Sequence, residues 1–241
     1  MRDAIVIIPT YNEIENIEAI LRAVFSQKKS FDVLVVDDNS PDGTSKAVKA
    51  LQNEFSSQLH LMIRSKKTGL GTAYIEGFKW CLTKQYDYIF EMDADFSHNP
   101  NDLINLYNAC AIDRADMSIG SRYINNKVNV VNWDMKRLLL SYFASKYVKL
   151  ITRMRIDDTT AGFVCYHRRV LETIDLDNIK FVGYAFQIEM KFNIYLNKFR
   201  IIEVPIVFTD RKKGKSKMSG GIISEAIFGV INMKFKSLFR S

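Results

Sequence analysis

Cysteine and histidine are scarce in this chain, which has three of each among its 241 residues. The cysteines are odd in number and lack CxxC or other metal-like spacing, a pattern that favours a reducing compartment over a disulfide-stabilised secreted fold. No histidine has a partner at the spacing of a zinc-ligand pair, so core or surface roles are expected for all three. The residues concerned are Cys81, Cys110, Cys165, His60, His98 and His167.

Long apolar runs and hydrolase motifs are also lacking. No apolar run approaches the roughly 18 to 20 residues that span a bilayer, so any membrane contact is expected to be peripheral. A strand predicted from Ala4 leaves no room for a signal peptide, which predicts a protein that stays in the cytoplasm. There is no GxSxG elbow and no Cys/His pair that would indicate a hydrolase.

The overall composition is that of an ordinary globular protein, with 47% hydrophobic and 25% charged residues. The length suits a single domain over residues 1–241. The net charge of +7 and the pI near 9.2 predict an acidic partner.

Short β-branched runs alternate with amphipathic stretches, which predicts an α/β fold with a mostly parallel sheet covered by helices. Helices are expected to begin near Glu13, Gly43, Gly71 and Pro100. There is no internal repeat or low-complexity linker, and residues 125–132 are expected to form a surface loop. Strands are expected at residues 4–8, 32–36, 60–63, 88–92 and 117–119.

Polar residues follow three of these predicted strands. In open parallel sheets, ligands bind beyond the carboxyl ends of the strands, so these polar groups are expected to meet on one rim of the sheet. The three groups are Thr10-Tyr11-Asn12-Glu13, Asp37-Asp38-Asn39-Ser40 and Asp93-Ala94-Asp95.

The acidic pair Asp93 and Asp95 is the strongest of these signals. Residues two apart on an extended strand point to the same side, where both carboxylates can serve a Mg²⁺ or Mn²⁺ ion that bridges phosphates. The alternative is a solvated turn, which the position after an apolar strand disfavours. Asp37 and Asp38 add a second indication, because adjacent acids repel each other unless a ligand donor or a cation uses one of them.

Two loops carry weaker signals. Residues 66–72 resemble a phosphate-cradling loop, because glycines before a helix expose backbone N–H groups, but they lack the GxGxxG and GxxxxGK[ST] spacings. A tight turn near the donor is the alternative. Five of the seven residues 211–217 are basic, and no RNA-binding pattern of aromatic residues accompanies them. Such a loop suits a phosphate clamp, and a solvated loop is the alternative.

Residues 137–155 and 222–239 each predict a helix with one broad apolar side and lysine or arginine on its flank or end. Basic amphipathic helices of this kind suit an anionic membrane surface. Packing on the protein core is the alternative for each helix alone. Two such helices together favour peripheral contact with a membrane.

Six motifs carry a resemblance that runs over nearly the whole chain. With them, the chain resembles the family-2 glycosyltransferases of the GT-A fold, and specifically the dolichyl-phosphate (polyprenyl-phosphate) mannosyltransferases. The glycine motif and the basic loop point to the mannosyltransferase branch. The motifs are Ile8-Pro9-Thr10-Tyr11-Asn12-Glu13, Val35-Val36-Asp37-Asp38-Asn39-Ser40-Pro41-Asp42-Gly43-Thr44, Gly69-Leu70-Gly71-Thr72-Ala73-Tyr74, Met92-Asp93-Ala94-Asp95-Phe96-Ser97-His98, Gly120-Ser121-Arg122-Tyr123 and Glu203-Val204-Pro205-Ile206.

The resemblance implies a Rossmann-like GT-A sheet with amphipathic interface helices and a C-terminal helix. Residues 1–122 would form the nucleotide-sugar-binding half, and residues 123–241 the half that faces the acceptor and the membrane. The implied enzyme transfers mannose from GDP-mannose to a polyprenyl phosphate, with inversion, at the cytoplasmic face of a membrane. No nucleic-acid partner is expected.

The resemblance also implies residue roles. Asp95 would be the principal ligand of Mg²⁺ or Mn²⁺, and Ser97 stands at a metal-proximal position where its short side chain favours a bridging water over direct ligation. Asp95, Arg211 and Lys217 are the implied catalytic residues. The implied phosphate-binding cations, for donor and acceptor, are Arg122, Arg137, Arg211 and Lys217. The implied donor-binding residues are Pro9, Tyr11, Glu13, Val36, Asp38, Asp93, Ala94 and Asp95.

Other functions stay open from the sequence. They are hexosyl transfer from a UDP-sugar to polyprenyl phosphate or another acceptor, a non-catalytic nucleotide-binding or membrane module, and a basic RNA-binding protein. The intact acidic pair and basic loop favour an enzyme. A lipid monophosphate has a second pKa near ~6, so its oxygen is nucleophilic at neutral pH and no general base is required.

Overall fold

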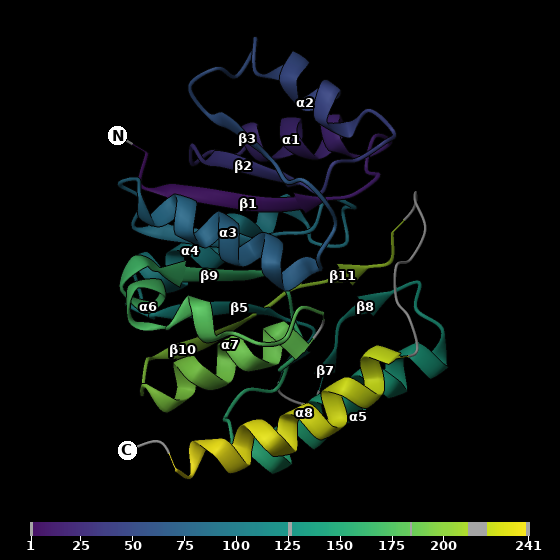
Figure 1. Ribbon diagram of the computed structural model, residues 1–241, viewed down its shortest axis with the longest axis vertical. Coiled ribbons are helices and arrows are strands. Elements are labelled where there is room, and N and C mark those ends of the chain that lie inside the picture. Colours follow the sequence, from purple (N-terminus) through teal and green to yellow (C-terminus); the bar gives the residue numbers. More distant parts are fainter. Residues whose placement is uncertain (1, 125–126, 184, 212–220, 240–241) are drawn as a thin grey trace.

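The computed structural model describes residues 2–124, 127–183, 185–211 and 221–239, with the backbone alone at 127 and 221–227. Its centre is a seven-stranded sheet in the order β10-β5-β9-β4-β1-β2-β3 (Figure 1). Neighbouring strands pair in parallel except β9, which is antiparallel to both β4 and β5. The strands are β1 (Ala4–Thr10), β2 (Asp32–Asp37), β3 (Leu59–Ile63), β4 (Tyr88–Glu91), β5 (Met117–Ser121), β9 (Val164–His167) and β10 (Ile201–Pro205).

Two short two-stranded ribbons are separate from this sheet. One joins β6 (Tyr123–Ile124) to β7 (Lys127–Val128), and the other joins β8 (Val130–Val131) to β11 (Phe208–Thr209). The second ribbon brings residues after β10 back beside the segment that leads into α5 (Met135–Thr152). It therefore sets the start of the basic loop, Asp210-Arg211, close to the start of that helix.

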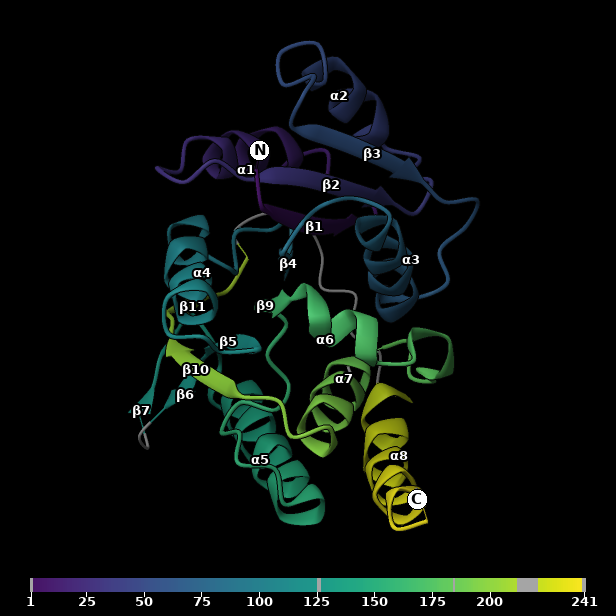
Figure 2. The ribbon, with the colours of Figure 1, turned by 90° about the vertical axis from the view of Figure 1, so that its left-hand side faces the viewer.

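Helices cover both faces of the sheet, as the view in Figure 2 shows. Residues of α1, α2 and α4 pack with Val6, Ile8, Val33 and Val35 on one face, and residues of α3 and α7 pack with Ile5, Ile7, Leu34 and Val36 on the other. Because successive strand residues alternate between the faces, both sets of strand residues are buried, as expected for a parallel sheet. The helices not yet bounded are α1 (Ile17–Phe25), α2 (Thr44–Leu51), α3 (Leu70–Leu82), α4 (Leu103–Ala111), α6 (Arg168–Thr173), α7 (Ala185–Leu196) and α8 (Gly221–Ser237), with one-turn 3₁₀ helices at Pro100–Asp102 and Leu176–Asn178.

The five predicted strands are present, and the helices predicted near Gly43 and Gly71 begin within one residue of those positions. At Pro100 a 3₁₀ turn begins, and α4 follows it from Leu103. The helix predicted near Glu13 begins four residues later, because a turn in which Asn16 and Ile17 donate to the Glu13 carbonyl comes first. The helix predicted at residues 137–155 is α5, and the helix predicted at 222–239 is α8. Strands β9 and β10 follow residue 123 yet belong to the same sheet as the earlier strands.

The glycine motif before α3 has a packing role. Gly69 has a φ of +114°, and an added Cβ there would lie 2.9 Å from the Val182 carbonyl oxygen. The Gly71 N–H donates to that same carbonyl at 2.9 Å. The structure thus favours the tight-turn interpretation of residues 66–72, with the glycines admitting the chain segment that precedes α7.

We predict that Gly71→Ala destabilises the fold by about 1–3 kcal/mol, because its Cβ would lie 2.8 Å from the Phe181 carbonyl oxygen and from the packed ring of Phe186. Thermal unfolding measures the effect. Gly162→Ala is the matched control, since its Cβ would meet nothing closer than 3.8 Å. Equal melting temperatures for the two variants would contradict the packing role.

Candidate active site

The carboxyl ends of β1 and β2 form the first part of the site. Asp37 is fully buried and accepts hydrogen bonds from the Thr10 hydroxyl at 2.8 Å, from the Ser40 hydroxyl at 2.6 Å and from the Ser40 N–H at 2.8 Å. These bonds use both of its oxygens, so Asp37 fixes the loop after β2. The repulsion expected between Asp37 and Asp38 is relieved within the protein itself.

Asp38 is held by a residue that the sequence did not predict. Arg64 follows β3, is buried, and donates to Asp38 at 2.8 Å, to Glu76 at 3.1 Å and to the hydroxyls of Thr68 and Thr72. Burial raises the pKa of Asp38, and the Arg64 charge opposes that effect. The only available signal was position, because Arg64 ends a strand on the same rim as Asp38.

The other predicted donor residues lie on this rim as well. Pro9 pairs with Val36 across the β1–β2 ladder, and Lys67 lies 4.5 Å from the centroid of the Tyr11 ring. Glu13 is almost fully buried, where its carboxylate accepts from Asn16 at 3.1 Å. The structure therefore brings together the predicted residues from β1 and β2.

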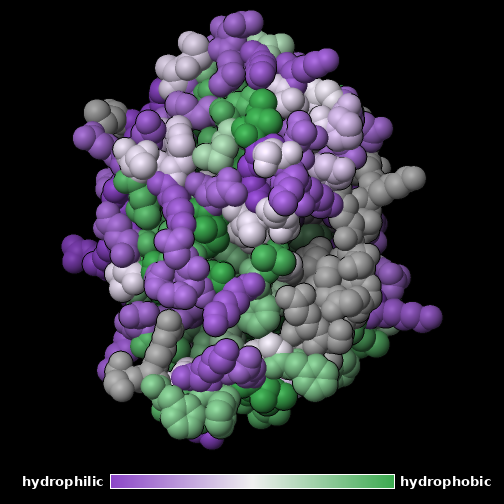
Figure 3. Space-filling view, viewed as in Figure 1, coloured by the Kyte–Doolittle hydropathy of each residue, from purple (hydrophilic) through white to green (hydrophobic). Residues whose placement is uncertain are grey.

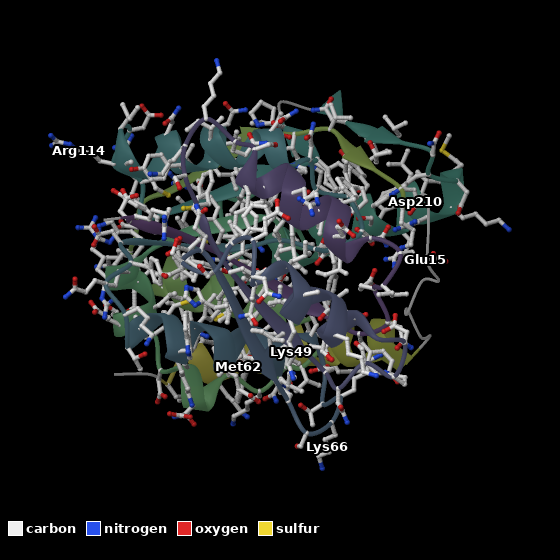
Figure 4. All side chains as sticks on the ribbon, turned by 90° about the horizontal axis from the view of Figure 1, so that it is seen from above. Glu15, Lys49, Met62, Lys66, Arg114 and Asp210 are labelled. Carbon is white, nitrogen blue, oxygen red and sulfur yellow. The ribbon has the colours of Figure 1, made fainter. Side chains whose placement is uncertain are left out.

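Figure 4 places this rim in the molecule. Glu15, just after β1, and Asp210, just after β11, lie on one side of the molecule, whereas Arg114, which precedes β5, lies on the opposite side. The carboxyl ends of β1 and β2 and the start of the basic loop thus lie at one edge of the sheet.

Asp93, Ala94 and Asp95 follow β4, which is the next strand beside β1. The Ser97 N–H donates to Asp95 at 3.0 Å across Phe96, whose φ is +61°. Burial alone would raise the pKa of Asp95, but hydrogen bonding from Ser97 and the charge of Arg211 outweigh it and lower that pKa. Burial and the neighbouring Asp95 charge raise the pKa of Asp93 to about 7. The two carboxyl groups are therefore unequal, since the pKa of Asp95 is lowered and that of Asp93 is raised.

Arginines from three segments each contact an aspartate, and one of these aspartates, Asp95, belongs to the acidic pair. Arg211 contacts Asp95 at 3.0 Å, and Arg137, at the start of α5, contacts Asp210 at 2.8 Å. Arg122 is buried and binds Asp158 through two nitrogens, at 2.7 and 2.6 Å. The predicted phosphate-binding arginines are thus gathered, and each contacts an aspartate.

Aromatic side chains hold these arginines in place. Arg137 lies 4.4 Å from the centroid of the Trp133 ring, and Arg122 lies 5.5 Å from it. Phe208, on β11, meets Trp133 edge to face at 5.3 Å and lies 5.5 Å from Arg122. Asp158 and Asp210 were not predicted, since a single acid without a motif gives no local signal. Lys217, predicted to bind phosphate, lies outside the described residues.

The described residues fit a divalent cation that is shared with a phosphorylated ligand. Carboxylate oxygens are hard donors of the kind that Mg²⁺ and Mn²⁺ prefer. Among the described residues no group of three or more His, Cys, Asp or Glu side chains could hold a metal alone. A site of this kind depends on phosphate oxygens for the remaining ligands. Asp95 would hold the ion, with Ser97 beside it.

A doubly wound sheet whose strand ends combine an acidic pair with clustered arginines defines the class of enzymes that act on nucleotide-linked substrates. The family model for glycosyl transferase family 2 matches residues 5–175, and the chain belongs to that family. It is therefore a glycosyltransferase.

Two characterised relatives match almost the whole chain. A polyprenol monophosphomannose synthase from Mycolicibacterium smegmatis is 45% identical over 94% of this chain and 84% of its own. An undecaprenyl-phosphate mannosyltransferase from Micrococcus luteus is 44% identical over 93% of this chain and 90% of its own. The chain therefore matches most of the length of both relatives.

Solved structures show the same fold at low identity. A glucosyl-3-phosphoglycerate synthase from Mycobacterium tuberculosis, solved with Mn²⁺ and UDP, matches with a TM-score of 0.67 at 14% identity, over 98% of this chain and 79% of its own. A mannosyltransferase from Pyrobaculum calidifontis, solved with GDP-Man and Mn²⁺, matches with a TM-score of 0.63 at 20% identity, over 99% of this chain and 64% of its own. The chain has the GT-A fold, as predicted.

A buried polar network lies beneath the acidic pair, and it was not predicted. Glu91, on β4, accepts hydrogen bonds from the Tyr166 hydroxyl at 3.1 Å and from Gln187. Lys191, on α7, donates to Gln187 at 3.1 Å and to the Ala161 carbonyl at 2.6 Å. Burial raises the pKa of Glu91 to about 7 and lowers that of Lys191 to about 8. The network joins β4 to β9 and α7.

We predict that Glu91 makes the fold less stable as the pH rises. The pKa of Glu91 is higher in the folded than in the unfolded chain. Its contribution to the free energy of unfolding is therefore fully present below about pH 4.5 and is lost as the pH rises through about 7. Relative to wild type, Glu91→Gln should therefore gain stability, on the order of 1 kcal/mol, between pH 5 and pH 8. Denaturant unfolding at several pH values measures this, and a stability difference that does not change with pH would refute it.

Proposed function

We propose that this enzyme transfers mannose from GDP-mannose to a polyprenyl phosphate with inversion at the anomeric carbon. The observation that carries the proposal is the contact of Arg211 with Asp95, since it sets a phosphate-binding cation directly against the donor-side acid. The names of the two relatives at 44–45% identity support the donor sugar and the acceptor class. The structure solved with GDP-Man supports the nucleotide.

The donor would bind along the rim formed by β1, β2 and β4. Pro9, Tyr11, Glu13, Val36 and Asp38 surround the nucleoside in this proposal, and Asp38 offers a carboxylate to its N–H or hydroxyl groups. Asp93, Ala94 and Asp95 lie next to the diphosphate. A Mg²⁺ or Mn²⁺ ion on Asp95 would supply charge stabilisation to the departing diphosphate.

The acceptor phosphate would bind at Arg137 and Arg211, with the buried Arg122 lying against the same Trp133 ring as Arg137. Lys217, which the resemblance implies as a further phosphate-binding residue, lies outside the described residues. Since the oxygen of the acceptor phosphate is already ionised at neutral pH, the reaction needs orientation and charge neutralisation rather than a general base. Arginine suits this task because its planar group binds phosphate oxygens in pairs. Bringing two anions together is the main electrostatic cost, and these cations offset it.

Contact with a membrane surface is part of the proposal. No helix in the described part of the chain is long and apolar enough to cross a bilayer. Helices α5 and α8 pack together and leave large apolar side chains exposed, and green residues gather at their end of the molecule in Figure 3. Lysines lie along both helices. The exposed residues are Met135, Leu139, Leu140, Phe143, Leu150, Phe228, Ile231, Phe235, Leu238 and Phe239.

These helices belong to the half at residues 123–241, which would face the acceptor and the membrane, while residues 1–122 would bind the donor. The proposed location is the cytoplasmic face, and the three buried, unbridged cysteines support a reducing compartment.

The donor is tested with a panel of labelled GDP- and UDP-sugars and polyprenyl phosphate. We expect label from GDP-mannose to enter the lipid phase in the presence of Mg²⁺ or Mn²⁺. Asp95→Ala should lower the rate by at least about 10³-fold, because the charge on the leaving diphosphate is no longer offset. Transfer from a UDP-sugar instead would favour the alternative donor, and a wild-type rate for Asp95→Ala would refute its metal role.

Membrane contact is tested with the double variant Phe143→Glu and Leu150→Glu, whose side chains are 62% and 76% exposed. Binding to vesicles that contain anionic lipid should fall roughly tenfold or more, because two apolar side chains no longer enter the interface. Ile112→Glu, at the end of α4 and 68% exposed, is the matched control and should bind as wild type does. Equal binding of all three proteins would rule out this surface.

A further inference from the structure

The three arginines around the site differ in how their aspartate partners are exposed. The Arg122–Asp158 pair is buried, with side-chain exposures of 9% and 0%. Arg137 and Asp210 are 28% and 29% exposed, whereas Arg211 is 22% exposed and its partner Asp95 only 6%. A buried bidentate pair is costly to break, whereas partly exposed pairs exchange partners readily. The Arg137–Asp210 pair can therefore change partners at low cost, and Arg211 can do so once a cation replaces it on the buried Asp95.

A phosphate and an aspartate compete for the same guanidinium nitrogens. Asp210 contacts Arg137 through Nη1, and Asp95 contacts Arg211 through Nη2. A phosphate oxygen that binds either nitrogen at hydrogen-bond distance takes the position of the carboxylate oxygen. Binding of a phosphate at these arginines is thus an exchange of one anion for another.

We propose that Asp210 is a positioning residue that competes with the acceptor phosphate for Arg137. Asp95 competes with the same phosphate for Arg211. The inference rests on the proposed function. It assigns Asp210 a role in setting the affinity for the acceptor and in returning Arg137 to its position when the product leaves.

The chain holds Asp210 where this exchange requires it. Its N–H donates to the Val131 carbonyl at 3.0 Å within the β8–β11 ribbon, and one of its carboxylate oxygens accepts from the Arg211 N–H at 2.9 Å. These bonds do not involve Arg137. Asp210 therefore stays beside both arginines while its charged partner changes.

The Asp95–Arg211 pair predicts an order of binding. Arg211 and a divalent cation use the same Asp95 carboxylate, so binding of the donor with its cation releases Arg211 for the acceptor phosphate. The donor is then expected to bind first and to increase the affinity for the acceptor.

Asp210→Asn tests the first pair. This substitution keeps the shape of the side chain and the acceptor for the Arg211 N–H, but removes the charge that competes with phosphate. Binding of citronellyl phosphate, a short isoprenyl monophosphate, to the full chain is measured by calorimetry. We expect Asp210→Asn to bind it roughly two- to fivefold more tightly, with a lower KM for the acceptor and no rise in kcat.

If Asp210 had a purely structural role, Asp210→Asn would lower the affinity for citronellyl phosphate, because a misplaced Arg137 would bind phosphate less well. Weaker or unchanged binding by Asp210→Asn overturns the proposal. Asp157→Asn is the matched control, since it removes one charge and an ion pair to Lys149 on α5 without touching the phosphate-binding arginines. Its affinity for the probe should stay within about twofold of wild type.

The second pair is tested with Asp95→Asn, again by binding rather than turnover. Wild type should bind citronellyl phosphate several-fold more tightly when Mn²⁺ and GDP are present. Asp95→Asn, without Mn²⁺ or GDP, should bind it as tightly as the loaded wild type. Weaker binding by Asp95→Asn, or no increase in wild type, overturns the order of binding, and the wild-type comparison holds even when the variant does not fold.

Failure of this inference is distinct from failure of the proposed function. A wild-type protein that neither binds the probe nor transfers mannose refutes the function. A wild-type protein that transfers mannose, combined with an Asp210→Asn variant that binds the probe more weakly, refutes the exchange alone.

Discussion

The pairing of β4 with β1 on one side and β9 on the other is the constraint on which the site depends. Parallel pairing with β1 aligns the end of β4 with the strand ends that carry Tyr11 and Asp38. Antiparallel pairing with β9 joins β4 to β5 and β10, which lead to Arg122 and to the basic loop. The acidic pair after β4 therefore lies between two groups of residues that are far apart in the sequence.

The charged side chains on this rim form pairs of a carboxylate and an arginine, and they do not form an open positive surface. Asp38, Asp95 and Asp158 each contact an arginine from another segment of the chain. The net charge of +7 predicts an acidic partner, but Arg122, Arg137 and Arg211 each contact a carboxylate of the protein itself. Buried pairs of this kind add little net stability, yet they fix the orientation of each carboxylate, and orientation is what a binding site requires.

The strand ends were predictable because each combines an apolar β-branched run with polar residues immediately after it, a pattern that is local in the sequence. Asp95 and Asp38 were found in this way. Strand β9 was not found, because its four residues have no extended pattern and its direction depends on partners more than 40 residues away in the sequence. Arg64, Asp158 and Asp210 were missed for a related reason, since a single charged residue acquires a role only through a distant partner.

Glycine contacts link α8 to the start of α3. The Phe181 ring lies against Gly229 of α8, and the backbone of the same segment lies against Gly69 and Gly71 at the start of α3. Residues 181 and 182 thus pack against glycines at the start of α3 and in α8. Over evolutionary time these positions are expected to change together: a larger residue at position 229 requires a smaller one at 181. A designer who alters α8 would have to choose residues for the start of α3 as well.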